Sequence, residues 1–179
     1  MKKSAATLLS EERFWEIVAH SDKGKELEAE LAKLTEDELF GFRYWWLRFS
    51  YQSYNQALWA VAYTVLGGCS DDSFDYFRNW LIARGKTVYY NAVRNADSLC
   101  DEFDDLTDKE YPEWEDVEYV PQEVFERKFK KDFHETEKTY DFNLEGFPDI
   151  EFEWQEDDEE SIRKVCPKTF SKWWNNDTF

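Results

Sequence analysis

Residues 67–85 read GGCSDDSFDYFRNWLIARG, and this stretch decides the fold. The glycine pair at its start ends a mostly apolar segment, because glycine adopts the left-handed backbone that closes a helix. Ser70 is well placed to accept a free backbone N–H at the start of the next helix. The apolar residues that follow recur at helical spacing: Phe74, Phe77, Leu81 and Ile82. The sequence therefore predicts a helix end, a tight turn and a complete second helix that Gly85 closes, with Arg78 outside its apolar face.

The acids at the start of this second helix have two interpretations. Asp71 and Asp72 lie in the first turn, where the positive helix end favours anions, so they can simply stabilise the helix. Alternatively, they form with Asp75 a carboxylate cluster for a divalent cation or for a basic group of a partner. One helix turn cannot aim three side chains at a single point without further ligands. We favour the structural role, and we keep Asp71, Asp72, Asp75 and Arg78 as candidate binding residues.

Cap residues and helical spacing predict most of the other helices. Thr35 and Glu38 form a capping box, in which the two residues satisfy each other's free backbone donors. The other residues expected at helix starts are Ser10, Asp22, Thr87 and Pro121. We expect helices over residues 11–20, 23–34, 36–52, 56–66, 71–84, 86–94 and 122–133, and a further turn over 98–106 capped by Asp97 or Ser98.

The third of these helices is unusually aromatic. Leu39, Phe42, Trp46 and Phe49 form one stripe, and further aromatic residues lie on its other sides. A helix that is apolar on several sides is expected to be buried centrally, or to be buried on one side and used for contact on the other; we favour central burial. Arg43 and Arg48 are then its polar outlets and are able to pair with acids from later in the chain.

The negative charge is concentrated in one segment. The chain carries 40 Asp and Glu against 22 Lys and Arg, a formal net charge of −18. Residues 97–160 hold 26 of these acids and 6 of the bases, a balance of 6 − 26 = −20, so the remainder is close to neutral. Such a segment repels nucleic-acid phosphates and anionic membrane surfaces. It suits a basic protein partner, cation binding or solubility.

The acidic half is also rich in aromatic residues. Trp114, Tyr119 and Trp154 are candidate contact anchors within it. Aromatic and polar residues alternate over 140–154, which fits either a small β-hairpin around Gly146 and Pro148 or an ordered loop that lays its aromatic rings on the helices. We expect a single domain over 1–179, with a helical core over 10–106 and an acidic, aromatic-rich region over 107–179 packed on it.

Motifs for known chemistries are missing. The three cysteines match neither a zinc pattern nor a CxxC redox motif, and no phosphate-binding glycine loop or nucleophile elbow occurs. Cys69 lies beside a helix start, which lowers a thiol pKa, but the neighbouring aspartates oppose that effect. We therefore expect Cys69 to be structural. No segment approaches the length of a membrane span, and the first residues do not form a signal peptide.

Three segments resemble the bacterial domain-of-unknown-function family 4240. They are FWEI at 14–17, LWAVAY at 58–63 and above all GGCSDDSFDYFRNWLIARGK at 67–86. The resemblance covers roughly residues 10–130. It implies a bacterial, cytoplasmic and mainly helical protein, and it carries over no activity, cofactor or catalytic residue.

These observations favour a mainly α protein, a compact bundle-like domain with an irregular acidic C-terminal part. We expect a non-enzymatic, cytoplasmic protein-binding module without a cofactor or metal, whose partner is a basic protein rather than nucleic acid or membrane. An immunity protein that neutralises a basic toxin is one version, by analogy only. The alternative is an enzyme or divalent-cation-binding protein centred on the turn from Cys69 to Asp75.

Overall fold

The structure is a computed structural model that describes residues 2–106 and 110–175; residues 107–109 and 176–179 of the acidic region lie outside these ranges. The chain is mainly α-helical, which confirms the predicted fold class. Its helices are α1 (Glu11–His20), α2 (Leu27–Leu31), α3 (Glu36–Gln52), α4 (Gln56–Leu66), α5 (Asp71–Ala83), α6 (Lys86–Arg94), α7 (Val120–Phe129), α8 (Phe133–Glu137), α9 (Glu159–Val165) and α10 (Pro167–Trp173). The 3-10 turns are η1 (Ala5–Thr7), η2 (Ala96–Asp101) and η3 (Asp116–Glu118), and the strands are β1 (Lys3–Ser4) and β2 (Tyr140–Asp141). Within the described ranges, no helix combines the length and apolar character needed to cross a bilayer.

The turn between α4 and α5 forms as the sequence predicts. Gly67 closes α4 with a φ of 69°, in the left-handed region, and the N–H of Gly68 donates to the carbonyl of Tyr63 at 3.1 Å. The hydroxyl of Ser70 then accepts from the backbone N–H of Ser73 at 3.2 Å and caps α5. The apolar face of α5 is buried, so the glycine turn and the serine cap determine which side of the helix meets the core.

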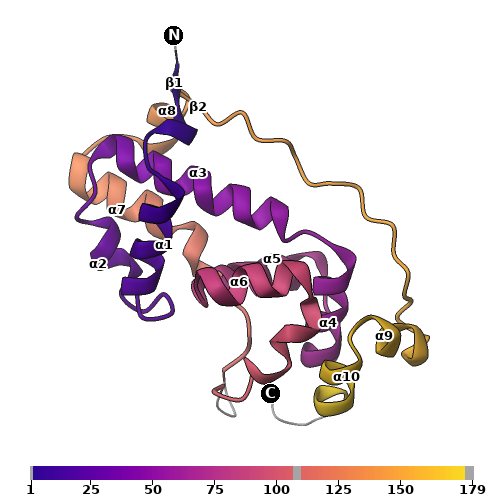
Figure 1. Ribbon diagram of the computed structural model, residues 1–179. Helices are drawn as coiled ribbons and strands as arrows, with labels where there is room; N and C mark the ends of the chain where they lie inside the picture. Colours follow the sequence, from indigo (N-terminus) through magenta and orange to yellow (C-terminus); the bar gives the residue numbers. More distant parts are fainter. Residues whose placement is uncertain (1, 107–109, 176–179) are drawn as a thin grey trace.

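Helix α3 lies between two groups of helices, as Figure 1 shows. It contacts η1, α1 and α7 as well as α5. Its capping box is formed: Thr35 accepts from the N–H of Glu38 at 3.3 Å, and Glu38 accepts from that of Thr35 at 2.8 Å. Gly41 lets residues 8–9 approach closely, because a Cβ there would lie 2.7 Å from the Cβ of Leu9. The predicted central position of this aromatic helix is confirmed.

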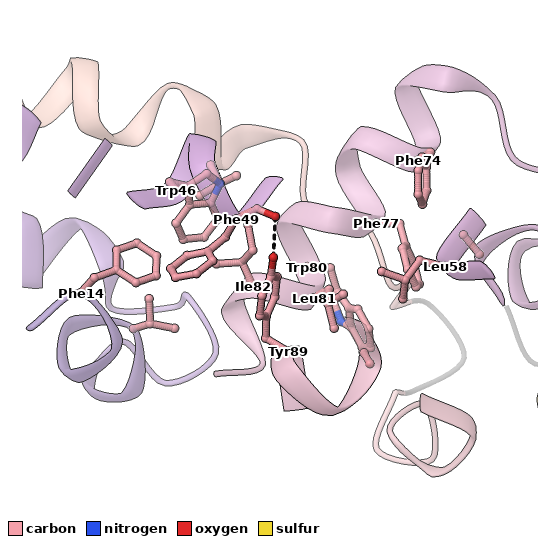
Figure 2. Close-up of a cluster of buried hydrophobic side chains, with 14 of the residues drawn as sticks. Phe14, Trp46, Phe49, Leu58, Phe74, Phe77, Trp80, Leu81, Ile82 and Tyr89 are labelled. Atoms are coloured by element: carbon pink, nitrogen blue, oxygen red, sulfur yellow. Dashed lines mark hydrogen bonds between the residues drawn. The ribbon is translucent and has the colours of Figure 1, made fainter. Parts of the chain in front are cut away.

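The core is built largely from aromatic rings (Figure 2). Phe14 of α1 lies against Phe49 of α3, with ring centroids 5.2 Å apart. The hydroxyl of Tyr89 on α6 donates to the carbonyl of Phe49 at 2.6 Å, so this buried phenol is satisfied. On the other side of α5, Trp59 stacks on Phe74 at 4.4 Å. Together with the aliphatic side chains between them, these rings belong to one hydrophobic cluster that includes α1, α3, α4, α5 and α6.

The predicted helix over 23–34 is wrong at its start. Asp22 does not cap it; Asp22 and Lys23 have φ angles of 47° and 55°, and the helix is limited to Leu27–Leu31. The buried Ser21 hydroxyl instead accepts from the N–H of Gly24 at 3.2 Å, which forms a turn. Gly24 lies against the ring of Trp114, which a Cβ would approach to 2.5 Å. A contact with a distant residue therefore outweighs the local helical pattern.

Helix α7 is shifted from its predicted range of 122–133. Pro121 lies in its first turn as predicted, but the helix ends at Phe129 because Lys130 adopts a left-handed conformation with a φ of 55°. Lys128 reaches across to α2, where its ammonium donates to the carbonyls of Ala32 and Leu34 at 2.7 and 2.5 Å. This contact joins the C-terminal turns of two helices.

Of the two alternatives predicted for residues 140–154, the ordered loop is correct and the β-hairpin is not formed. Strand β2 pairs in parallel with β1 at the N-terminus, with Lys3 opposite Tyr140. Residues 142–153, here called the strap, then run from β2 towards α9 without regular structure, along one side of the molecule (Figure 1). Phe147 lies on Tyr54 at 4.6 Å and Phe152 on Trp59 at 5.5 Å. The aromatic rings pack on helices rather than across a hairpin.

Two predicted caps were also assigned wrongly. Gly85 rather than Thr87 lies at the start of α6, with a φ of 93°. Asp97 does not cap its own turn but is buried and caps α10, its carboxylate accepting from the N–H groups of Lys168 and Thr169 at 3.0 and 2.8 Å. An aspartate some 70 residues away thus satisfies the first free donors of a helix that begins with proline.

We expect Asp97→Ala to lower the free energy of unfolding by about 1–2 kcal/mol, because two backbone donors of α10 lose their partner. The measurement is urea unfolding followed by tryptophan fluorescence. Ser98→Ala, an exposed neighbour, is the matched control. Equal urea midpoints for the two variants would contradict this role for Asp97.

Candidate functional site

The acids of the α5 start lie where a helix-stabilising role requires. Asp71 and Asp72 are exposed in the first turn. Asp75 has a side chain that is 43% exposed and pairs with Arg78 one turn later. Over residues 2–106 and 110–175, no group of three or more His, Cys, Asp or Glu side chains is arranged to hold a metal ion. The three aspartates thus do not form a shared ligand set in this part of the chain.

Arg78 is the unexpected residue of this helix, because it is completely buried. One terminal nitrogen donates to the carbonyl and the hydroxyl of Ser50 at 2.7 and 2.9 Å, and the other donates to Asp75. Its Nε donates to the carbonyl of Phe74 at 3.3 Å. Three rings surround the guanidinium at 4.9–5.0 Å, those of Tyr54, Phe74 and Phe147. Arg78 therefore joins α3, α5 and the strap, and it is not accessible to a ligand.

Burial lowers the pKa of Arg78 to about 10, and the nearby Tyr54 and Glu118 oppose that shift. The guanidinium still carries its proton at neutral pH. Its charge therefore has to be compensated inside the protein, and the contacts to Ser50 and Asp75 provide that compensation.

Residues 113–119 lie along α5. The N–H of Trp114 donates to the carbonyl of Tyr76 at 3.0 Å, and the amide of Asn79 donates to the carbonyl of Trp114 at 3.3 Å. The ring of Trp114 meets that of Trp46 edge to face, with centroids 5.9 Å apart. The indole N–H of Trp46 in turn donates to the oxygen of Asn79 at 2.9 Å. Trp114, a predicted anchor, is thus half-buried and fixes this segment to α3 and α5.

This arrangement creates a surface that we call the acidic aromatic face. It consists of Asp72, Asp75, Tyr76, Glu115, Glu118 and Tyr119. Burial and then the charge of Glu115 raise the pKa of Tyr76, and Asp72 and Tyr119 act in the same direction. Tyr76, Asp72, Glu115 and Tyr119 therefore share one electrostatic environment, although they come from α5 and from the residues on either side of η3. Glu118 likewise acts on the pKa of Arg78, which pairs with Asp75.

The structure separates the predicted contact residues. Asp72, Asp75 and Tyr119 meet on the acidic aromatic face, and Tyr119 is 56% exposed. Trp154 is only 5% exposed, and its indole N–H donates to the carbonyl of Gln56 at 2.9 Å, so it fixes the end of the strap to α4. The geometry favours Tyr119 over Trp154 as a contact residue.

A cavity of about 230 Å³ opens beside Tyr119, between α3, α5, η3, α7 and α8. Much of its wall is apolar, from Phe42, Trp46, Leu47, Val117, Pro121 and Phe133. Arg43, Glu118 and His134 add charged or titratable groups. Arg43 pairs with Glu137 at 2.5 Å, which confirms the predicted pairing with a later acid, whereas Arg48 donates to the hydroxyl of Tyr44. No sequence signal marks this cavity, because its wall comes from five separate elements.

Two larger hollows lie elsewhere. One of about 440 Å³ is lined by Lys23, Arg84 and Asp105 among others, and one of about 530 Å³ lies between α3 and the strap and includes Arg48. Each of them already contains basic side chains of the chain itself. None of the three hollows is lined by Asp71, Asp72 or Asp75.

Cys69 is half-buried, and its thiol faces the carbonyl of Ser70 at 3.7 Å. Burial raises the pKa of the Cys69 thiol to about 12, and Glu113 and Asp71 add to that effect. The thiolate, which is the reactive form, is therefore scarce at neutral pH. The charge of Arg78 acts in the opposite direction, but burial outweighs it, so the described surroundings do not activate this sulfur as a nucleophile.

We expect Arg78→Lys to lower the free energy of unfolding by about 2–3 kcal/mol, because lysine cannot reproduce the forked contacts to Ser50 and Asp75. Urea unfolding measures the change. Arg94→Lys, on the exposed side of α6, is the matched control and should change stability by less than about 0.5 kcal/mol. A comparable small effect at both positions would show that the buried contacts contribute little.

We expect iodoacetamide to alkylate Cys69 at least about a hundredfold more slowly in the folded chain than in urea, because the raised pKa removes the thiolate. Peptide mass spectrometry follows each of the three cysteines separately. The folded-chain rate should rise steeply in strongly alkaline buffer. Equal rates with and without urea at neutral pH would refute the raised pKa.

The geometry by itself identifies no known chemistry, and comparisons with known proteins agree with that. A search of curated proteins found no match, and a search of solved structures found none either. A scan against protein families matches residues 9–127, which include α1 to α6, η3 and most of α7. The chain therefore belongs to the family described as "Protein of unknown function (DUF4240)".

Proposed function

We propose that the protein is a non-enzymatic, cytoplasmic binding module that captures a basic protein through the acidic aromatic face. It needs no cofactor for this task. An immunity or inhibitor protein directed at a basic toxin is one form that the proposal takes, by analogy with small acidic inhibitors.

The observation that carries the proposal is where the exposed aromatic residues lie. The large hydrophobic side chains that are about half exposed in the described residues are Tyr111, Tyr119, Phe147 and Phe152, with exposed fractions of 51%, 56%, 49% and 49%. All four fall within the segment 97–160, which carries the whole negative balance. Exposed tyrosine and phenylalanine beside unpaired acids are typical of residues that dominate a protein interface.

Ion pairing divides the acids of segment 97–160 into those that are paired within the chain and those that are not. The acids of 101–105 are engaged internally: Asp101 and Asp104 pair with Lys172 at 3.0 and 2.7 Å, and Glu102 pairs with Arg84 at 2.9 Å. In contrast, Glu115 and Glu118 form no ion pair within the part of the chain that the structure describes. Carboxylates without an ion-pair partner attract a basic protein during encounter, and this attraction weakens as the salt concentration rises.

The alternative, an enzyme or cation-binding protein centred on Cys69 to Asp75, has less support. Its thiol is held in the unreactive form, and Arg78 is buried among partners within the chain. The acids of this helix instead contribute to a surface shared with η3.

The proposal predicts that the immobilised chain retains basic proteins from lysate of its source cell and releases them as salt is raised. Glu115→Gln/Glu118→Gln should weaken this capture by about tenfold, as the loss of two charge contacts implies. The matched control, Glu156→Gln/Asp157→Asn, removes the same charge from exposed residues before α9 and should change it little. The captured proteins are identified and quantified by mass spectrometry.

Equal losses in the two double variants would show that net charge alone causes retention. Retention of no basic protein, or retention that salt does not weaken, would refute the proposed function.

A further inference from the structure

We infer that the cavity beside Tyr119 receives one arginine side chain of the captured protein. This inference rests on the proposed function and adds the chemical class of the group that is recognised. It assigns to the cavity a role that neither the family nor the sequence indicates.

The size of the cavity suits a side chain better than a separate ligand. Its volume is about 230 Å³, whereas small-molecule sites commonly occupy roughly 300–1,000 Å³. Its apolar wall, formed by Trp46, Leu47, Val117 and Phe133 among others, can enclose an aliphatic stem of three methylene groups. Burial of that stem contributes favourable free energy without any polar contact.

Glu118 is the acid on the wall that can meet the head of such a guest. It is exposed and, over the described residues, it pairs with no base. A guanidinium at the mouth would donate its N–H groups to the carboxylate oxygens of Glu118 while lying on the exposed ring of Tyr119. A planar, forked cation makes both contacts at once, which lysine cannot do.

The other polar groups on the wall do not compete for this role. Arg43 is neutralised by Glu137 at 2.5 Å and lies over the ring of Phe133 at 5.3 Å. Asn79 is buried, and both of its amide atoms are used, by Trp46 and by Trp114. His134 is exposed on the wall, on the helix that carries Glu137.

The two larger hollows are poorer hosts for a cation. Lys23 and Arg84 share Asp105 in one of them, and Arg48 lies in the other. A basic guest there would meet bases of the chain itself. The cavity beside Tyr119 also has an arginine on its wall, Arg43, but that base is paired with Glu137, whereas Glu118 on the same wall forms no ion pair among the described residues.

The test uses N-acetyl-arginine amide as a probe and N-acetyl-norleucine amide as an uncharged counterpart. Each is titrated into the ¹⁵N-labelled full chain, and the indole N–H signal of Trp46 reports occupancy of the cavity. We expect saturable shifts with the arginine probe and about tenfold weaker binding of the norleucine probe, the loss of one charge-assisted contact.

Two variants assign the site, and one serves as the control. Glu118→Gln should weaken arginine binding by about tenfold, and Leu47→Trp, which fills the cavity, should abolish it. Glu123→Gln, an exposed acid of α7 that does not line the cavity, should leave it unchanged. Circular dichroism and urea midpoints verify that each variant is folded, and every titration is read against the free state of the same variant.

Equal binding of the norleucine probe, unchanged binding in the filled variant, or no shift with either probe would each overturn the inference. In those cases, salt-sensitive capture that depends on Glu115 and Glu118 would still support the proposed function. If the arginine probe binds but no basic protein is captured, the proposed function fails, and with it the assignment of the guest to a protein partner.

Discussion

The completely buried guanidinium of Arg78 holds α3, α5 and the strap together. An unpaired buried charge would destabilise the protein strongly, so the contacts of Arg78 to Ser50 and Asp75 have to form whenever the chain folds. The rings of Tyr54 and Phe147 cover the same group from the loop after α3 and from the strap. Because these partners lie up to about 100 residues apart, this one cation makes the arrangement of three segments interdependent.

The candidate site follows from that arrangement. Asn79, the next residue of α5, is buried where α5 meets α3 and uses its amide to connect Trp46 with the carbonyl of Trp114. Residues 113–119 are thereby laid along α5, which brings Glu115 and Tyr119 close to Tyr76 and makes η3 part of the cavity wall. The buried polar residues of α5, Arg78 and Asn79, thus position the acidic aromatic face, whose side chains are wholly or partly exposed.

Local signals predicted the parts of this structure that depend on near neighbours. The caps at Ser10, Thr35 and Ser70, and the glycine turn at residue 67, involve donors within five residues, so a short sequence window contains all of the interaction. This is why α1, α3 and α5 were predicted at their observed starts and α4 at its observed end.

The predictions that were wrong concern residues whose interaction partners lie far along the chain. Gly24 turns against Trp114, Asp97 caps a helix some 70 residues later, and β2 pairs with the N-terminus rather than with a neighbouring strand. The burial of Arg78 and the cavity beside Tyr119 belong to the same class, since no window of sequence contains their walls. The pairing of Arg43 with a later acid was anticipated across such a distance, because an arginine on a buried aromatic helix is the polar group able to meet an acid from elsewhere in the chain.

The placement of the acids distinguishes a binding surface from acidity that serves only solubility. A net charge of about 2–8 in magnitude is enough to keep a small domain soluble, and this chain carries −18. Like charges held close together destabilise the folded state, so carboxylates beyond that need are retained at a cost. An exposed aromatic ring such as that of Tyr119 lowers solubility, so it would not be expected on a segment whose acids serve only to raise solubility. Unpaired acids and exposed rings on the same segment therefore support the proposed capture of a basic, partly apolar partner over a role in solubility alone.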